Sequence, residues 1–156
     1  MLGGDGEDNS DLFDGFGNGS LHMYVVCTPD WKPYQEGDAR YLDMDFHYTD
    51  WEALFFGALN AHQWEPHVEG DNAHEHQERN RRKFHESIPD FPTLRTIYDM
   101  YEDYRFDFAG TQNLRDECTR LKYRLTHELA IKALRKLIYG CDEAIKAKCD
   151  LMFVCD

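Results

Sequence analysis

Four histidines in one polar stretch of the chain are the residues that come nearest to a metal-binding set. They are His62, His67, His74 and His76, and acidic residues lie among them. Zinc accepts imidazole and carboxylate ligands, but neither the paired-cysteine nor the His-Glu-x-x-His spacing of common zinc sites is present. A polar surface insertion over residues 63–85 explains the same composition. We therefore expect an insertion without metal or cofactor, and keep a metal-dependent enzyme built on these histidines as an alternative.

Two carboxylates spaced two residues apart, Asp43 and Asp45, form the second group able to do chemistry. They alternate with apolar residues in a predicted strand, so Leu42, Met44 and Phe46 face one way and the acidic side chains the other. Such a pair can serve acid–base chemistry or hold a metal, but it is more often a solvated edge or a partner contact. We interpret the two carboxylates as surface charges that bind a partner. The predicted aromatic anchors beside them are Trp31, Tyr34 and Tyr41.

The charge of the chain is concentrated in its first half. Residues 1–75 contain sixteen acidic residues against only Lys32 and Arg40, a net charge of −14, whereas residues 76–156 have a net charge of +1. The first half also contains twelve of the 22 aromatic residues. Two interpretations of this acidity are open: it serves solubility alone, or it steers a basic partner onto an aromatic-rich face. The short basic run at residues 79–83 is expected to pair with the protein's own carboxylates, so we predict no direct nucleic-acid binding.

Length and composition predict one domain. Residues 1–20 are rich in Gly and Asp and are expected to be a flexible acidic tail, although Phe13 and Phe16 offer a means of docking it. Residues 21–156 are expected to form a single α+β domain. No apolar run is long enough for a membrane span, and the N-terminus does not resemble a signal peptide. The five cysteines have no paired spacing, which predicts a reduced, cytoplasmic protein.

The periodicity of apolar residues predicts the strands and helices on which the candidate carboxylates and aromatic residues lie. Strands are predicted at residues 21–28, 40–48 and 151–156. Two shorter helices are predicted, one from a capping box formed by Thr49 and Glu52, the other from Thr93 to about Tyr104. A small mixed or antiparallel sheet packed against several helices is the architecture that this order favours.

Residues 111–148 contain the longest helical stretch, with one apolar stripe that must be buried. Its first half runs through Leu114, Cys118, Leu121, Leu125 and Leu129. Basic residues such as Arg135 and Lys136 fall largely off the stripe. The stretch is too long for one ordinary helix, so it predicts two helices, with a break near residues 126–128 or a bend at Gly140.

The C-terminal pattern resembles small bacterial immunity-type proteins. The residues that carry the resemblance are Leu114-x-x-Glu117-Cys118-x-x-Leu121, Ala130-x-x-Ala133-Leu134-x-x-Leu137, Cys141-Asp142-Glu143-Ala144-Ile145 and the terminal strand. The resemblance implies a cytosolic antitoxin that binds and blocks a cognate toxin enzyme. It assigns no binding site, because these residues are expected in the core.

The sequence thus favours a non-enzymatic acidic protein that inhibits or neutralises a partner with a basic active site. An immunity protein and a phage anti-defence protein both fit this description. The absence of a nucleophile–base set, a phosphate loop or a zinc signature points the same way. The alternatives are the metal-dependent enzyme and a structural or assembly subunit. No membrane association is expected, and the oligomeric state is left open.

Overall fold

Within the residues that the structure describes, four antiparallel strands form one sheet. The computed structural model describes residues 8–13, 21–32, 36–58, 75, 91–97, 99, 101–126 and 128–155. The strand order is β2-β1-β4-β3. The strands are β1 (Leu21–Val26), β2 (Ala39–Phe46), β3 (Tyr104–Phe106) and β4 (Asp150–Cys155). The predicted α+β class is confirmed, with the sheet antiparallel throughout.

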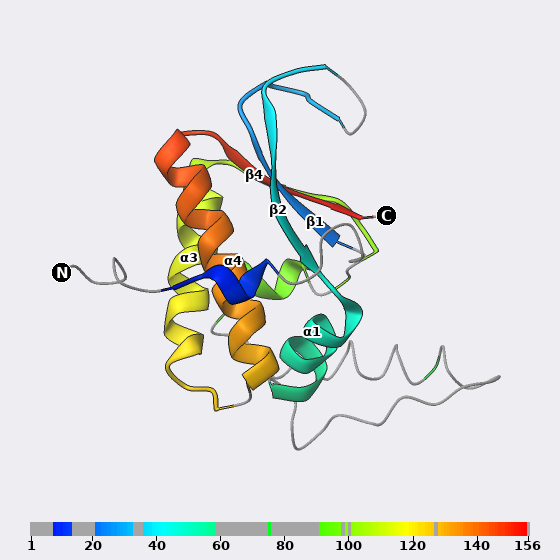
Figure 1. The fold of residues 1–156 in the computed structure, drawn as a ribbon, viewed down its shortest axis with the longest axis vertical. Coiled ribbons are helices and arrows are strands. Elements are labelled where there is room, and N and C mark those ends of the chain that lie inside the picture. Colours follow the sequence, from blue (N-terminus) through cyan, green and yellow to red (C-terminus); the bar gives the residue numbers. More distant parts are fainter. Residues whose placement is uncertain are drawn as a thin grey trace.

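Two long helices, α3 (Phe108–Lys122) and α4 (Glu128–Ala147), lie side by side against one face of the sheet (Figure 1). The carboxylate of Asp107 caps α3 by accepting a hydrogen bond from the backbone N–H of Gly110 at 2.8 Å. Gly140 of α4 packs so closely on β1 that a Cβ there would come within 2.5 Å of Met23 Sδ. No helix in the described part of the chain, α4 included, is long and apolar enough to cross a membrane.

The predicted break between the two long helices is confirmed, because α3 ends before residue 123 and α4 begins at residue 128. Leu114, Cys118 and Leu121 are buried as predicted. Leu129 is 44% exposed, because it lies in the first turn of a separate helix whose own buried stripe begins at Ala130. Lys136 was expected off the stripe, yet its side chain is completely buried.

The first short helix begins earlier than predicted. α1 (Tyr48–Glu52) has His47, not Thr49, as its N-cap residue. The carboxylate of Asp50 reaches back to accept a hydrogen bond from the His47 N–H at 3.3 Å. The chain then continues as a π-helical turn, η2 (Ala53–Ala58). A capping box is present at the start of this helix, as predicted, but it lies two residues earlier in the sequence than the predicted one.

The helix predicted from Thr93 to about Tyr104 is wrong. The described residues of this segment form a 3-10 turn, η3 (Leu94–Ile97), and the chain then enters β3. The buried carboxylate of Glu117 on α3 accepts hydrogen bonds from the N–H groups of Thr93 and Leu94, both at 2.9 Å. Residues 104–106 form β3, which pairs with β4 and is an edge strand of the sheet. These tertiary contacts outweigh the helical pattern.

Residues 8–13 belong to the folded body, in contrast to the flexible tail expected for residues 1–20. They include a 3-10 turn, η1 (Ser10–Leu12), in which Leu12 is completely buried. Arg135 of α4 donates hydrogen bonds to both carboxylate oxygens of Asp11, at 2.8 and 3.0 Å. The ring of Phe13 packs edge-on against Tyr139, with 5.6 Å between centroids. Docking through Phe13 was the right alternative for this part of the segment.

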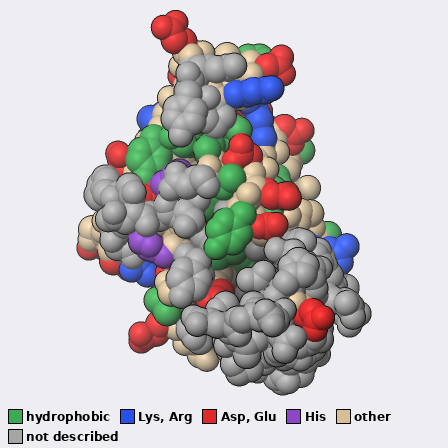
Figure 2. Space-filling model, turned by 90° about the vertical axis from the view of Figure 1, so that its right-hand side faces the viewer, with side chains coloured by type: hydrophobic (Ala, Val, Ile, Leu, Met, Phe, Trp, Pro, Cys, Tyr) green, Lys and Arg blue, Asp and Glu red, His purple; other side chains and the backbone are tan. Residues whose placement is uncertain are grey.

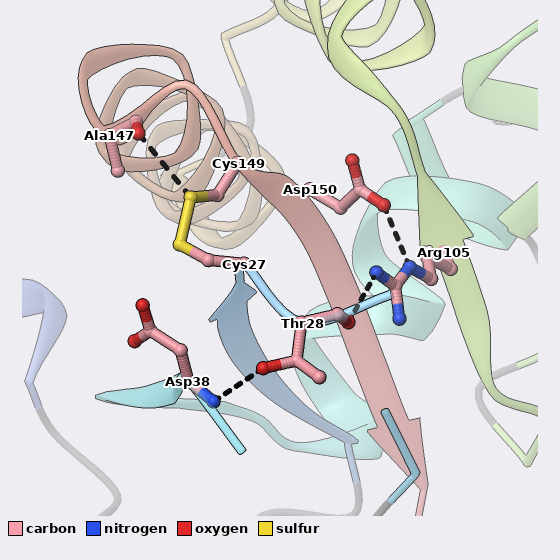
Figure 3. The surroundings of a disulfide bond; sticks show 7 residues. All are labelled: Cys27, Thr28, Asp38, Arg105, Ala147, Cys149 and Asp150. Carbon is pink, nitrogen blue, oxygen red and sulfur yellow. Dashed lines mark hydrogen bonds and ion pairs between the residues drawn. A yellow bond between two sulfur atoms is a disulfide. The ribbon is translucent and has the colours of Figure 1, made fainter. Parts of the chain in front are cut away.

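Cys27 and Cys149 form a disulfide bond, so the expectation that all five cysteines are reduced is wrong for this pair (Figure 3). Val26 of β1 pairs with Asp150 of β4. One further step in the same register sets the two cysteines opposite each other, with Cα atoms 4.8 Å apart. Their sequence separation of 122 residues concealed the pair. The three remaining cysteines, Cys118, Cys141 and Cys155, do not take part in this disulfide.

Candidate functional site

The face of the sheet turned away from α3 and α4, here called the outer face, brings together side chains from separate strands. Directly paired residues of neighbouring strands share a face. His22 of β1 is therefore beside Asp45 of β2, and Tyr24 is beside Tyr41. Figure 2 looks onto the side of the molecule away from the long helices and shows hydrophobic and acidic side chains next to one another. This is the face on which strand alternation placed the predicted partner-binding residues.

Three aromatic side chains form a continuous row on the outer face. The ring of Tyr24 lies 5.4 Å from that of Trp31 and 5.3 Å from that of Tyr41, centroid to centroid. Both tyrosines are partly exposed, whereas Trp31 is only 8% exposed because it packs in a small cluster with Val26 and residues of β4. The structure thus brings together two of the predicted anchors. It also places Tyr24 between them, a residue that was not among the predicted anchors.

Asp45 lies within a buried polar group and not at the surface. Its side chain points to the outer face, as predicted, but its carboxylate is covered by His22 and Tyr41 and has no exposed area. Its Oδ1 lies 2.6 Å from His22 Nδ1 and also accepts a hydrogen bond from the Tyr41 hydroxyl. Burial, and then the bond to Asp45, raise the pKa of Tyr41 far above its usual range, so this hydroxyl is a fixed donor. The prediction of Asp45 as an exposed charge is wrong.

Asp43 is exposed, as predicted, and lies in an irregular part of β2. The pairing register with β1 shifts between His22 and Tyr24, as in a β-bulge. Asp43 has a φ of 56°, in the left-handed region that aspartate tolerates better than most residues. Its neighbours Leu42 and Met44 stay buried. The bulge therefore projects this carboxylate into solvent without disturbing the core.

A hollow of about 660 Å³ opens beside the aromatic row. Its lining consists of Pro29, Asp30, Trp31, Lys32, Asp103, Arg105, Asp150 and Met152. Arg105 of β3 donates from Nε to Asp150 Oδ2 at 2.8 Å and from Nη2 to the backbone oxygen of Thr28 at 3.0 Å. The lining thus contains both signs of charge, partly engaged with each other. This composition suits the polar rim of a protein interface.

A buried ion pair holds β2 and α1 against α4. Nζ of Lys136 donates to the backbone oxygen of Asp45 at 2.8 Å and to Asp50 Oδ2 at 3.3 Å. The same ammonium group lies 5.6 Å from the centre of the Phe46 ring. The pair fixes the end of β2, and with it the backbone beneath the outer face. Sequence reasoning missed it, because a lysine off the apolar stripe gives no signal of burial.

Charge is separated between the two layers. Residues 21–47, which include β1, β2 and their connection, contain five acidic and two basic residues, a net charge of −3. Residues 108–147, which include α3 and α4, contain five acidic and eight basic residues, a net charge of +3. The exposed carboxylates of the first group are Asp30, Glu36, Asp38 and Asp43. Of these two segments, the one that contains β1 and β2 is therefore acidic and the one that contains the two long helices is basic.

The predicted metal candidates His62, His67, His74 and His76 lie outside the described residues, as does Tyr34. Among the residues that the structure does describe, no group of three or more His, Cys, Asp or Glu side chains is arranged to hold a metal ion. The metal-dependent alternative therefore receives no support from this part of the chain.

Comparison with protein-family models, curated proteins and solved structures gives no match for this chain. The resemblance to immunity-type proteins stays a prediction.

Proposed function

We propose that this protein is a non-enzymatic acidic binding protein that inhibits or neutralises a partner protein with a basic active site, of the immunity or phage anti-defence kind. The observation that carries the proposal is the acidic β1–β2 unit with its aromatic row. The partly exposed Tyr24 and Tyr41 lie on β1 and β2. One exposed carboxylate, Asp43, lies on β2, and the other three lie on the connection between the two strands. Aromatic anchors and complementary charge are what protein interfaces use for affinity and for rapid, selective association.

The hydrogen bonding of the outer face favours binding over catalysis. His22 and Tyr41 are each hydrogen-bonded to the carboxylate of Asp45. A general acid or base works best with a pKa near the working pH, whereas the pKa of Tyr41 is moved away from that range. These groups therefore support a preformed surface. A surface that is ordered before binding loses less entropy when the partner arrives.

The charge separation supports the choice of a basic partner. The negative charge of the β1–β2 unit and the positive charge of the segment with α3 and α4 would orient the protein during approach, so that the β1–β2 unit meets a positive site first. The resemblance of the helical stripe to immunity-type proteins suggests the same class of partner. In this proposal α3 and α4 supply the core that supports the sheet.

The test begins with capture of the partner from host lysate on immobilised protein at low salt, followed by identification and separate purification of that partner. We expect the partner to be an enzyme whose activity falls to near zero at an equimolar amount of this protein. The association rate should fall by on the order of tenfold between about 0.01 M and about 0.15 M salt, because the Debye length shrinks from about 30 Å to about 8 Å.

A charge variant and a matched control locate the surface. Asp30→Asn with Asp43→Asn should slow association several-fold with no loss of folding, since both side chains are exposed and asparagine tolerates the φ of residue 43. Asp116→Asn removes a carboxylate that is 73% exposed on α3 and should leave the rate unchanged. A salt-independent rate with full inhibition by the double variant would exclude this surface, and chemical turnover of the partner would overturn the non-enzymatic proposal.

A further inference from the structure

The Cys27–Cys149 disulfide joins the end of β1 to the chain just before β4, next to the paired residues Val26 and Asp150 (Figure 3). Cys27 directly follows β1, and Cys149 lies in the short turn between α4 and β4. The chain that leaves Cys27 runs through residues 28–38 into β2. This connection carries Trp31 of the aromatic row and three of the four exposed carboxylates of the proposed binding surface.

The described contacts at the base of this connection gather around the disulfide. The backbone N–H of Cys27 donates to the Asp38 oxygen at 2.7 Å, and the N–H of Asp38 donates to Thr28 Oγ1 at 2.6 Å. Arg105 holds the backbone oxygen of Thr28 from the other side (Figure 3). The disulfide is the covalent member of this set, so its loss would leave the base held by hydrogen bonds.

The disulfide is placed where a reductant can reach it. Cys27 is exposed and Cys149 is half-buried. Cys118 and Cys141, in contrast, are buried, and burial raises the pKa of both thiols, so neither is poised for exchange. The Ala147 carbonyl oxygen lies 3.3 Å from Cys149 Sγ, a position in which a reduced thiol can donate an S–H bond to it. In the reduced protein the Cys149 thiol therefore has a hydrogen-bond acceptor within reach.

We propose that the Cys27–Cys149 bond is a redox switch of the binding surface, which a dithiol reductant opens to release the β1–β2 connection and weaken partner binding. A thiolate of the reductant attacks one sulfur and forms a mixed disulfide, and the second thiol of the reductant then displaces the protein thiol. The S–S bond of the protein breaks, that of the reductant forms, and two electrons and two protons pass to the two cysteines. The released connection has more conformational freedom to lose when the partner binds.

The weaker binding of a partner after reduction rests on the proposed function. The loosening of the β1–β2 connection can be measured in the absence of any partner. Amide hydrogen exchange is compared for the oxidised protein and for the protein reduced with dithiothreitol. We expect the Cys27 and Asp38 amides to exchange at least about tenfold faster after reduction, with protection within α4 unchanged. Cys27→Ser with Cys149→Ser should give the fast pattern without reductant. Cys155→Ser, which removes a cysteine outside this disulfide, should respond to reductant as the unsubstituted protein does.

Each outcome decides a different point. Equal exchange rates in both states would overturn the switch, and so would loss of protection throughout α4, because the bond would then be a general cross-link of the fold. With the partner in hand, the reduced protein should associate several-fold more weakly, and equal affinity despite a loosened connection would overturn the regulatory effect. Failure of the proposed function would be recognised separately, as a lack of inhibition by the oxidised protein.

Discussion

Replacing Lys136 by methionine should destabilise the fold strongly, although methionine nearly matches the length and volume of the lysine side chain. Lys136 is completely buried, and its partner Asp50 has a side chain that is only 6% exposed. The substitution leaves the Asp50 carboxylate without its buried cation and removes a donor from the Asp45 carbonyl. Removal of one member of a buried ion pair costs about 3–5 kcal/mol. At about 2–4 °C per kcal/mol for a chain of this size, the melting temperature should fall by on the order of 10 °C.

Urea unfolding is the appropriate assay, with tryptophan fluorescence as the signal. Trp51 is a suitable reporter, since it is buried and its indole N–H donates to the Ile97 backbone oxygen at 3.1 Å. Lys136→Met with Asp50→Asn should recover much of the loss, because no unpaired charge then remains and an amide can still accept the His47 N–H. Lys146→Met, at an exposed position near the end of α4, should cost less than about 1 kcal/mol.

The reasoning would be refuted by a Lys136→Met protein within about 1 kcal/mol of the unsubstituted protein at equal m-value. It would be refuted equally by a double variant no more stable than the single one. Either result would mean that the cost of desolvating the ammonium group offsets its contacts, so that the pair contributes little.

Three further measurements check other parts of the structure. Leu12→Ala should lower the melting temperature by several degrees, because a completely buried leucine is truncated, and an unchanged value in differential scanning fluorimetry would show that residues 8–13 do not pack on the body. The hydrogen bond from Arg135 lowers the pKa of the Asp11 carboxyl. Docking is therefore fully stabilised above the ordinary aspartate pKa and is lost as pH falls through the lowered pKa. The protection factor of the Leu12 amide should fall below about pH 4, and constant protection there would contradict this. In the native protein without reductant, only the thiol of Cys155 should react readily with Ellman's reagent, and three thiols should react after unfolding. Rapid reaction of Cys118 or Cys141 in the native protein would contradict their burial.

Local patterns predicted the elements whose residues repeat with a clear period. The alternation in β2 placed Leu42, Met44 and Phe46 in the core, and the structure buries all three. The stripe of the C-terminal half predicted two long helices, and the break between them was located to within a few residues. Predictions of this kind succeed because a period of 2 or 3.6 residues is written in consecutive side chains.

Errors arose where a distant segment competes with the local pattern. Residues 94–97 have helical spacing, yet Glu117 from α3 takes the N–H groups at the start of this turn, and β4 draws the following residues into the sheet. The candidate site shows the same effect. Asp45 was assigned to the correct face of its strand, but its exposure depends on His22 and Tyr41, which cover it.

Local patterns and composition were enough to predict the α+β class, the strands of the N-terminal half, the paired helices and the acidity of the β1–β2 unit. These features follow from neighbouring residues and need no knowledge of the fold. The burial of Lys136 against the Asp45 backbone, 91 residues away, and the pairing of Cys27 with Cys149 across 122 residues became visible only in the folded chain. Contacts of this range depend on strand register and helix packing, and a single sequence does not encode either in any local pattern.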